Sequence, residues 1–340
     1  MKGSLEVMRK SKYHTRWLTP EEFETWDQLV AMSPQGTLFH QVCWLRALGE
    51  SFGILGCFDR VAELVGGIPA LYTRRFSFSF LRPPYFLPYS GPVVRKIKGK
   101  HFNKLSTYKK IVEPLAQGLV DAFLFVRINM HYAVNDIQPF LWQKFVPLVR
   151  YTYLVDLEDL DVAFKELDVD RRNDIRRGER DGLACEQSEN IEEFMPLLLR
   201  SLQAQGIRWS EQRVKQFRDC FSASSLMGRG RLFLVRNDSD TLLGGAWLVW
   251  DQHRSYYLLT GMDRELAGRT AIPTLVWHMM RYTREVLGLK WFDFDGADVP
   301  QIEAFVRAFG GHLVPCFVAA WVSPALRPLW LVHQWLSWAW

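Results

Sequence analysis

The chain has 340 residues, of which 48% are hydrophobic and 23% charged, as is typical of a globular protein that buries a sizeable core. This length predicts two domains, at about 150 residues each. The formal net charge of +5 is too small for a dedicated nucleic-acid binder, although it suits a phosphate-bearing ligand. The 14 Trp residues fit either thick cores or a surface that meets ligands or lipid.

The cysteines and the N-terminal segment narrow the class of protein further. The five cysteines show no C-x-x-C spacing, which predicts reduced core cysteines and neither a disulfide framework nor a metal site. Residues 1–16 lack the apolar segment of a signal peptide. No stretch reaches the roughly 18 apolar residues that a membrane span needs. These features predict a cytoplasmic protein.

The first half of the chain opens on a helix-start signal. In Thr19-Pro20-Glu21-Glu22, the Thr and the Glu three residues later match a capping box, and Pro occupies the first helical position. Gly66-Gly67 lies inside a predicted strand and indicates a bulge or a close backbone approach. The predicted elements are helices 20–32 and 41–48, strands 53–58 and 61–72, a Pro- and aromatic-rich loop 81–92, a basic segment 95–100, helix 106–121 and strand 122–129.

The second half has clearer element boundaries. Asn190 with Glu193 matches a capping box, Ser210 and Asp298 are predicted N-caps, and Gly288 is a predicted C-cap. The predicted elements are strand 151–157, helices 160–167 and 170–182, strand 183–187, helices 190–204 and 210–221, strands 231–236, 243–250 and 253–261, helix 271–287, strand 289–295, helix 298–309 and strand 312–322. This order predicts an α/β domain with a mixed sheet.

The two halves share a short sequence pattern. Residues 64–70 (LVGGIPA) are similar to residues 242–248 (LLGGAWL), and each stretch lies in the second strand of a predicted hairpin. Together with the similar order of elements, this predicts an internal duplication. We therefore expect two tandem α/β domains with mixed sheets, at residues 1–150 and 151–319.

Four stretches, taken in order, are similar to a known family. They are residues 36–41 (GTLFHQ) with Trp44, residues 171–178 (RRNDIRRG), residues 243–246 (LGGA) leading to Tyr256-Tyr257, and residues 292–296 (FDFDG) followed by Phe305 and residues 309–311 (FGG). The C-terminal half resembles a GNAT-type acyltransferase domain. The whole chain resembles the Fem-type peptidoglycan aminoacyltransferases, which carry two GNAT-like domains in tandem.

The resemblance implies an N-acyltransferase of bacterial cell-envelope metabolism. Its donor would be acyl-coenzyme A or aminoacyl-transfer RNA, and its acceptor an amine of a small molecule or of a cell-wall precursor. The chain departs from the family at the donor loop, where Arg264 stands one residue too far from Gly268. Val306-Arg307 stands where the family often has a lysine, and the long helical hairpin that engages transfer RNA is missing. The donor therefore stays open between these two.

A donor's phosphates need an anchor, and the start of the long helix offers one. Gly268-Arg269-Thr270-Ala271 opens this helix, where free backbone N–H groups favour a phosphate. Arg264 and Arg269 add positive charge. The alternative is an ordinary helix start with solvated arginines.

A basic helix is predicted to bind an anionic acceptor. Arg171, Arg172, Arg176 and Arg177 form its basic face, and forked guanidinium groups suit phosphate or carboxylate. Arg307 is added as an acceptor-binding residue through the family resemblance. The alternative is a solvated face that Asp170, Asp174 and Glu179 neutralise.

Two carboxylates and two tyrosines are the candidates for proton transfer. Asp293 and Asp295 are two residues apart on a predicted strand and so share one face, where their pairing would raise the pKa of one of them. Tyr256 and Tyr257 are alternative proton donors. The competing interpretation is a strand-end turn and packed tyrosines. His40 and His278 are predicted to be structural.

The C-terminal tail, residues 327–340, would be apolar nearly all round if it were helical. It either packs back on the first domain, which we favour, or lies in a membrane interface at the inner face of the membrane. The leading functional prediction is an N-acyltransferase without a metal. The alternative is a non-catalytic GNAT-like module that binds an anionic metabolite at the loop 81–91.

Overall fold

The computed structural model describes residues 12–76 and 78–327, and these fall into two compact units. Unit 1 takes in the chain up to Val42, Glu50–Leu148, and the chain from Phe317 onward. Unit 2 consists of Cys43–Gly49 and Val149–Cys316. The predicted placement of the tail falls mostly on residues 328–340, which lie outside the described residues.

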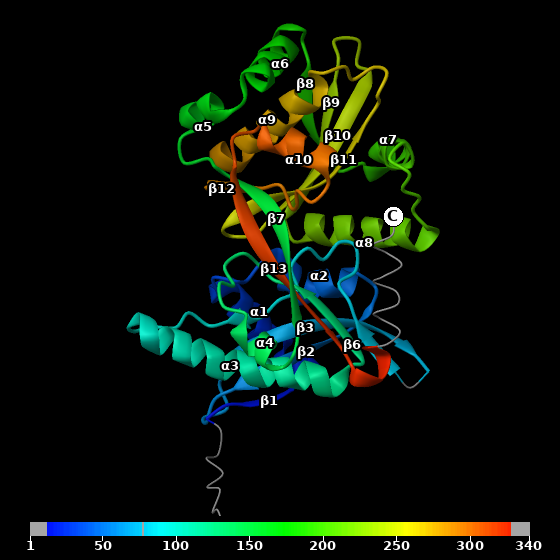
Figure 1. Cartoon of the computed structure of the whole chain (residues 1–340). Coiled ribbons are helices and arrows are strands. Elements are labelled where there is room, and N and C mark those ends of the chain that lie inside the picture. Colours follow the sequence, from blue (N-terminus) through cyan, green and yellow to red (C-terminus); the bar gives the residue numbers. More distant parts are fainter. Residues whose placement is uncertain (1–11, 77, 328–340) are drawn as a thin grey trace, which may run out of the picture. The chain divides into compact units, whose positions relative to one another are not determined.

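Unit 1 is built on a mixed sheet with the order β1-β2-β3-β4-β6-β13, in which β5 pairs with β3 (Figure 1). The strands are His14–Trp17 (β1), Ser51–Phe58 (β2), Leu64–Arg75 (β3), Phe78–Leu81 (β4), Val93–Val94 (β5), Phe125–Asn129 (β6) and His312–Val322 (β13), of which residues 317–322 belong to this unit. The helices are Phe23–Met32 (α1), His101–Ala122 (α3) and Gln138–Trp142 (α4), with 3-10 turns at Pro20–Glu22 (η1), Leu38–His40 (η2) and Pro324–Leu326 (η3).

Unit 2 repeats the arrangement with the order β7-β12-β11-β10-β9-β8. Its strands are Val146–Asp156 (β7), Ala184–Ser188 (β8), Gly230–Arg236 (β9), Leu242–Trp250 (β10), Arg254–Met262 (β11) and Trp291–Asp293 (β12). Its helices are Val42–Ala47 (α2), Leu160–Glu166 (α5), Val169–Arg180 (α6), Ile191–Gln203 (α7), Glu211–Leu226 (α8), Ala271–Glu285 (α9) and Pro300–Arg307 (α10). The predicted fold class, two tandem α/β units with mixed sheets, is confirmed.

Several helices begin where a side chain accepts hydrogen bonds from the free backbone N–H groups of the first turn. The Glu22 carboxylate accepts from Thr19 N at 2.9 Å, as the predicted capping box requires. Asn190 caps α7, but Glu193 binds Arg236 instead of completing a capping box. The predicted cap of α10 is wrong.

Asp298, the predicted cap of α10, has another role. Its carboxylate accepts from Arg150 Nε at 2.8 Å and from Tyr151 N at 3.1 Å, while α10 begins at Pro300. The charged and backbone donors of β7 therefore outcompete the start of α10 for this carboxylate. Three short elements, β1, β4 and α4, are absent from the sequence-based prediction because four or five residues give little periodic signal.

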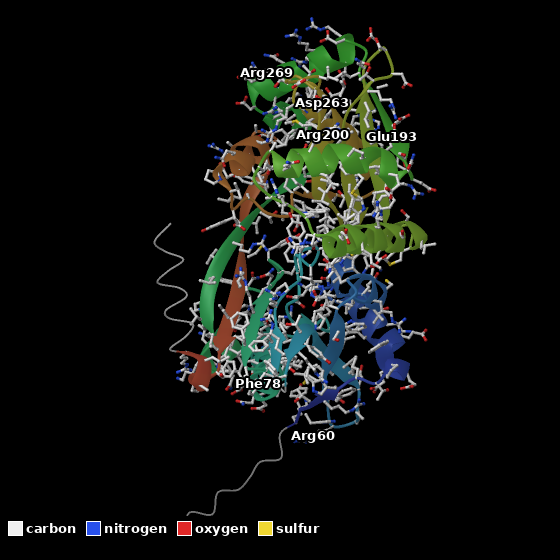
Figure 2. The ribbon with its side chains drawn as sticks, turned by 90° about the vertical axis from the view of Figure 1, so that its right-hand side faces the viewer. Arg60, Phe78, Glu193, Arg200, Asp263 and Arg269 are labelled. Carbon is white, nitrogen blue, oxygen red and sulfur yellow. The ribbon has the colours of Figure 1, made fainter. Side chains whose placement is uncertain are left out.

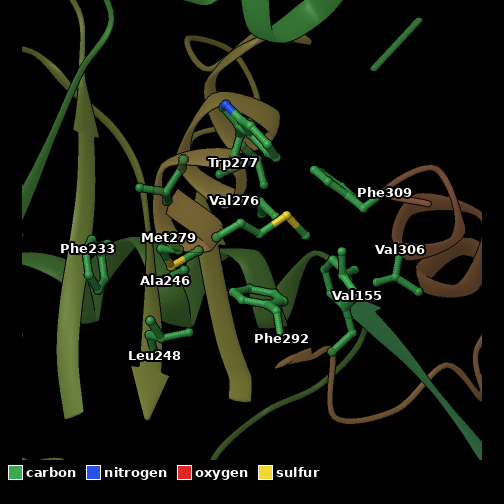
Figure 3. Packing of buried hydrophobic residues seen from close by; sticks show 14 of the residues in the cluster. Val155, Phe233, Ala246, Leu248, Val276, Trp277, Met279, Phe292, Val306 and Phe309 are labelled. Carbon is green, nitrogen blue, oxygen red and sulfur yellow. The ribbon is translucent and has the colours of Figure 1, made fainter. Parts of the chain in front are cut away.

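Each unit has its own apolar core. In unit 1 the core lies between the sheet and α3, where Ile111, Leu115 and Leu119 are fully buried. In unit 2 the core lies between the sheet and α9, and Figure 3 shows Trp277, Phe292 and Phe309 packed in it. At about 25 cal/mol per Å² of apolar surface, such burial is the main source of stability of each unit. Within the described residues, no helix combines the length and the apolar composition that crossing a membrane requires.

The Gly-Gly strands show the duplication in detail. A Cβ on Gly66 would meet Ile111 of α3, and one on Gly244 would meet Ile272 of α9. On the opposite face, a Cβ on Gly67 would meet Trp26 of α1, and one on Gly245 would meet Phe194 of α7. Each pair of glycines thus lets one helix approach each face of its strand.

The bulges occupy the same position in both units. On β3 the partner of Phe58 is Leu64 and that of Cys57 is Gly66, which leaves Val65 as the extra residue. On β10 the partner of Arg236 is Leu242 and that of Val235 is Gly244, which leaves Leu243 as the extra residue. A bulge directly before Gly-Gly in both strands confirms that residues 64–70 and 242–248 are equivalent.

Candidate active site

Strands β11 and β12 of unit 2 run parallel and then separate. Their pairing ends at Tyr256↔Asp293, whereas β11 continues to Met262. Beyond Tyr256, β11 pairs only with β10 among the strands of the described residues. Parallel strands bind ligands outside their carboxyl ends, where a sheet leaves backbone groups without a strand partner. Residues 257–261 therefore have no strand partner within the described chain on their outer side, beside the end of β12.

A bulge lies on this same edge. Trp247 pairs with Leu259 and Leu248 with Tyr257, so Leu258 is an extra residue of β11 relative to β10. A bulge leaves the extra residue outside the ladder and re-aims its backbone groups, and it is common next to active sites. The bulge at Leu258 therefore gives the edge backbone N–H and C=O groups that a ligand can use.

Eight residues, 263–270, connect the end of β11 to the start of helix α9, at the same end of the sheet. Gly268 in the connecting segment has a φ of +57°, a left-handed conformation that favours glycine. Thr270 precedes the first turn of α9 without a side-chain cap. Ala271 N donates to Ala267 O at 3.4 Å and Pro273 has no N–H, so Ile272 supplies the backbone N–H group of this turn that can meet an anion. Arg269 is exposed beside this turn. The predicted donor anchor thus stands at the carboxyl end of β11.

Helix α7 holds the end of β11 in place. Ser201 Oγ donates to Met262 O at 2.9 Å and accepts from Met262 N at 2.8 Å. A Cβ on Gly261 would lie 2.7 Å from the α7 backbone, so only glycine permits this approach. Arg200 of α7 lies 3.9 Å from Asp263, at the start of the connecting segment (Figure 2).

The basic helix α6 and the start of α9 line a common pocket of about 460 Å³. Its lining residues are Asp170, Asn173, Asp174, Arg176, Arg177, Arg180 and Arg269. Asp174 Oδ1 lies 3.7 Å from Arg269 Nε and so ties the arginine to α6. Arg264 and Arg172 lie outside this lining. Residues that the sequence assigned to two separate ligands therefore meet at one place.

Two other predicted acceptor residues have partners within the protein. The Arg171 guanidinium lies over the rings of Phe305 and Phe309, at 5.0 and 5.5 Å from their centroids. Burial lowers the pKa of Arg171. Arg307 Nε lies 3.2 Å from Glu303 on the same helix, although the Arg307 side chain stays exposed. Arg171 therefore fastens α6 to α10, whereas Arg307 remains accessible.

The two carboxylates after β12 differ in their surroundings. Asp293 is fully buried, and its Oδ1 accepts from Thr152 Oγ1 at 2.5 Å and from Asp295 N at 2.9 Å. Asp295 has a φ of +54° and is half-buried. Burial, followed by the charge of Asp293, raises the pKa of Asp295 well above its ordinary value, while Arg150 opposes the shift. A carboxyl group with a raised pKa suits proton transfer near neutral pH.

The two adjacent tyrosines point to opposite faces of β11. Tyr256 is fully buried and its OH donates to Asp251 Oδ2 at 2.6 Å, which argues against proton donation to a ligand. Tyr257 is half-buried on the side of Phe294 and hydrogen-bonds Thr260. Burial raises the pKa of Tyr257, so its phenol stays protonated at neutral pH.

Comparisons with known proteins agree with this geometry. Residues 169–300 match the family model of the acetyltransferase (GNAT) domain, a range that runs from α6 through β12. A crystal structure of FemX superposes with a TM-score of 0.72, at 15% identity over 94% of this chain and 99% of that chain. The chain has a tandem GNAT fold.

Two further solved structures share the tandem GNAT fold. One is the C-terminal domain of a putative lysylphosphatidylglycerol synthetase from Agrobacterium fabrum, with a TM-score of 0.58 at 14% identity over 88% of this chain and 92% of that chain. The other is a tandem GNAT protein from the clavulanic acid biosynthesis pathway, with a TM-score of 0.52 at 11% identity over 91% of this chain and 97% of that chain. No curated protein matches the chain in sequence.

Several residues at the site escape sequence-based prediction. Arg200 is the single arginine of α7, Arg180 lies two residues beyond the RRNDIRRG stretch of α6, and Asp174 was interpreted as a neutralising charge rather than a partner of Arg269. Thr152 lies 141 residues before Asp293, so no spacing links them. In residues 12–76 and 78–327 no cluster of three or more His, Cys, Asp or Glu is arranged to hold a metal, and all five cysteines are free.

Proposed function

We propose that the chain is an N-acyltransferase whose active site lies at the carboxyl ends of β11 and β12 in unit 2. The observation that carries this proposal is the unpaired edge of β11 next to the N-terminus of α9. An extended donor can pair its amide groups with the strand edge while its phosphates meet the helix start. The acyl group then lies near Asp295.

The donor carries phosphate groups. The pocket between α6 and α9 is lined by four arginines and two aspartates, so it keeps a surplus of positive charge. Guanidinium groups bind phosphate oxygens in forked pairs. We therefore assign Arg176, Arg177 and Arg269 together to the donor, with Gly268, Thr270 and Ala271 supplying the helix start. Acyl-coenzyme A is the donor that we test first, and aminoacyl-transfer RNA is the second.

The chemistry that we propose is direct transfer. The acceptor nitrogen attacks the acyl carbonyl carbon, a C–N bond forms, and the C–S bond of a thioester (or the C–O bond of an ester) breaks. The Asp295 carboxylate takes the proton from the amine. The leaving group takes a proton from the Tyr257 phenol and departs as a thiol or an alcohol, and proton exchange with solvent then restores the Asp295 carboxylate and the Tyr257 phenol. Backbone N–H groups at the Leu258 bulge stabilise the oxyanion. Asp293 and Thr152 position Asp295 through the hydrogen bonds described above.

The acceptor is a primary amine, and amines of cell-wall precursors are the class that the Fem-type likeness suggests. Arg307 is our acceptor-binding candidate, because its side chain is 65% exposed on α10, the helix that follows β12. The Tyr257 phenol is our candidate for the proton donor to the leaving group.

The first experiment measures thermal unfolding of the full chain with acetyl-coenzyme A, a long-chain acyl-coenzyme A and free coenzyme A. A ligand at a hundredfold excess over its dissociation constant stabilises the folded state by about 2.7 kcal/mol. A raised midpoint supports the coenzyme A donor. An unchanged midpoint with all three compounds contradicts that donor and moves the test to aminoacyl-transfer RNA.

The second experiment separates an enzyme from a binding module. Thiol release from acetyl-coenzyme A is followed with a panel of primary amines. Amine-dependent release supports the transferase, whereas coenzyme A binding without release for any acceptor supports a non-catalytic module for an anionic metabolite.

A further inference from the structure

Residues 95–100 of unit 1 correspond to the donor-loop residues 263–270 of unit 2. β5 pairs with Gly66-Gly67 as the end of β11 pairs with Gly244-Gly245, and in each unit the next element is the long helix. Residues 64–112 contain ten Lys and Arg and no Asp or Glu, although the whole chain has a net charge of only +5. The start of α3 therefore lies in a strongly basic part of unit 1.

Apolar side chains lie next to these charges. Phe102, with 79% of its surface exposed, and Leu105 lie on one stripe of α3 together with Lys109, at spacings of three and seven residues. Lys109 Nζ lies 5.5 Å from the ring centroid of Trp142, which is itself 48% exposed on α4. Figure 1 shows α4 beside α3, and the two helices are in contact. The apolar side chains thus continue from the start of α3 to α4.

We propose that this surface, formed by Lys96, Lys98, Lys100, Phe102, Leu105 and Trp142 and called here the α3 surface, docks the protein on an anionic phospholipid bilayer. The three lysines are exposed and meet the headgroup phosphates. Phe102 and Leu105 insert among the upper acyl carbons, and Trp142 takes the headgroup level that its amphipathic ring prefers.

Charge and side-chain type together favour a lipid occupant. Asp136 pairs with Lys109 at 3.4 Å. The segment 95–100, which carries the three lysines of the α3 surface, contains no Asp or Glu that could neutralise them. A nucleic acid also carries phosphates, and the rings of Phe102 and Trp142 can stack on bases, but the exposed Leu105 and Leu141 offer no ring for stacking and fit acyl chains instead. Exposed apolar groups bordered by lysines match the two layers of a bilayer surface, apolar beneath and anionic above.

The test is co-sedimentation of the full chain with vesicles of pure phosphatidylcholine and with vesicles that contain phosphatidylglycerol. We expect binding to the anionic vesicles and at most weak binding to the neutral ones. Replacing Lys96, Lys98 and Lys100 with Gln lowers affinity for anionic vesicles about fivefold per lysine. Phe102→Ser combined with Leu105→Ser reduces binding to both kinds of vesicle.

A matched control places the same substitutions in unit 2. Lys165→Gln with Leu226→Ser changes an exposed lysine and an 89% exposed leucine, and it is expected to bind vesicles as the unaltered chain does. Unchanged thermal unfolding shows that the variants are folded. The proposal is overturned if the α3-surface variants bind vesicles normally. It is also overturned if the lysine variants lose binding to a poly(U) RNA probe while vesicle binding persists.

Discussion

The two units share one strand pattern and differ at a single place. In unit 2, β11 runs unbroken from its first partner on β10 to the partners of Gly244-Gly245. In unit 1, the equivalent strand is divided into β4 and β5, and the loop 82–92 lies between them. The strand edge that we propose for the donor therefore has no continuous counterpart in unit 1.

The inserted loop also covers the end of the neighbouring strand. Ser90 N donates to Asn129 O at 2.8 Å, and Asn129 N donates to Ser90 Oγ at 3.1 Å. Phe86, Leu87 and Tyr89 of the same loop are buried. The loop that the sequence suggested as a binding cleft instead packs into unit 1. The duplication has kept the helix–sheet core in both units and an open strand edge in one.

Register counting makes the chemical difference specific. In unit 1, Tyr72 pairs with Leu81, which pairs with Val126. In unit 2, the equivalent residue Trp250 pairs with Ser255, which pairs with Phe292. Val126 is therefore equivalent to Phe292. Asn129 therefore stands where unit 2 has Asp295. A neutral side-chain amide, on a residue whose backbone is bonded to the loop, therefore replaces a carboxyl group with a raised pKa.

The largest expected effect comes from replacing that carboxyl group. Asp295→Asn should lower kcat by roughly 10²–10⁴-fold, because it removes the proposed base. In the unaltered enzyme, kcat rises with pH through the raised pKa of Asp295, and the variant should lose this rise. A pH–rate profile with acetyl-coenzyme A and an accepted amine measures both. Asn129→Ala in unit 1 is the control, and equal losses in the two variants would contradict a single active site.

Stability should show the opposite dependence on pH. Because the pKa of Asp295 is raised in the folded state, its contribution to stability is full at low pH and is lost as pH rises through that pKa. Asp295→Asn stays neutral, so its stability relative to the unaltered chain should increase with pH. Chemical denaturation at several pH values checks the sign of this change.

The next largest effect concerns Trp321 of β13, the last strand of the unit 1 sheet. Trp321 of β13 pairs with Val126 of β6, packs near Phe145, and is 7% exposed in the core of unit 1. Trp321→Ala should lower the free energy of unfolding by about 3–5 kcal/mol. Because Trp321 belongs to unit 1, donor affinity measured well below the unfolding midpoint should stay unchanged. A loss of affinity in fully folded protein would contradict this separation of roles.

The sequence predicts what is local and repeated. The Gly-Gly pattern predicts the duplication, and the start of α9 predicts the donor anchor, because both depend on neighbouring residues. Strand pairing does not follow from local pattern. β13 follows α10 in the chain but pairs with β6, and β7 follows α4 but pairs with β12. No spacing reveals such pairings.

The site shows the same division. Asp293 and Asp295 are predicted as a pair because they lie two residues apart, but their surroundings depend on β7. Thr152 donates to Asp293, and Arg150 opposes the raised pKa of Asp295. The α6 arginines were assigned to the acceptor because sequence alone does not place them beside Arg269. Long-range packing decides which charges share a pocket.

A smaller effect tests the two helix starts against each other. Arg269→Ala should weaken coenzyme A binding roughly 10- to 100-fold, since a hydrogen bond to a charged group contributes about 1.5–3 kcal/mol. Lys100→Ala removes the basic residue directly before α3 and should leave that affinity unchanged. Isothermal titration calorimetry measures both, together with the number of sites, which we expect to be one. Two sites, or equal effects of the two substitutions, would contradict the loss of the donor edge in unit 1.

The smallest effect tests the feature that the two units share. A Cβ on Gly67 would lie 2.9 Å from Leu55 O, and one on Gly245 would lie 3.0 Å from Phe233 O, so neither strand can accept a side chain without moving its neighbour. Gly67→Ala and Gly245→Ala should each lower the free energy of unfolding by about 1–3 kcal/mol. A Cβ on Gly49 would meet nothing within 4 Å, but Gly49 has a left-handed φ of +66°. Gly49→Ser therefore adds backbone strain without crowding. Chemical denaturation of all three variants separates crowding from strain. Losses at Gly67 and Gly245 no larger than at Gly49 would mean that close helix approach is not what the duplicated Gly-Gly preserves.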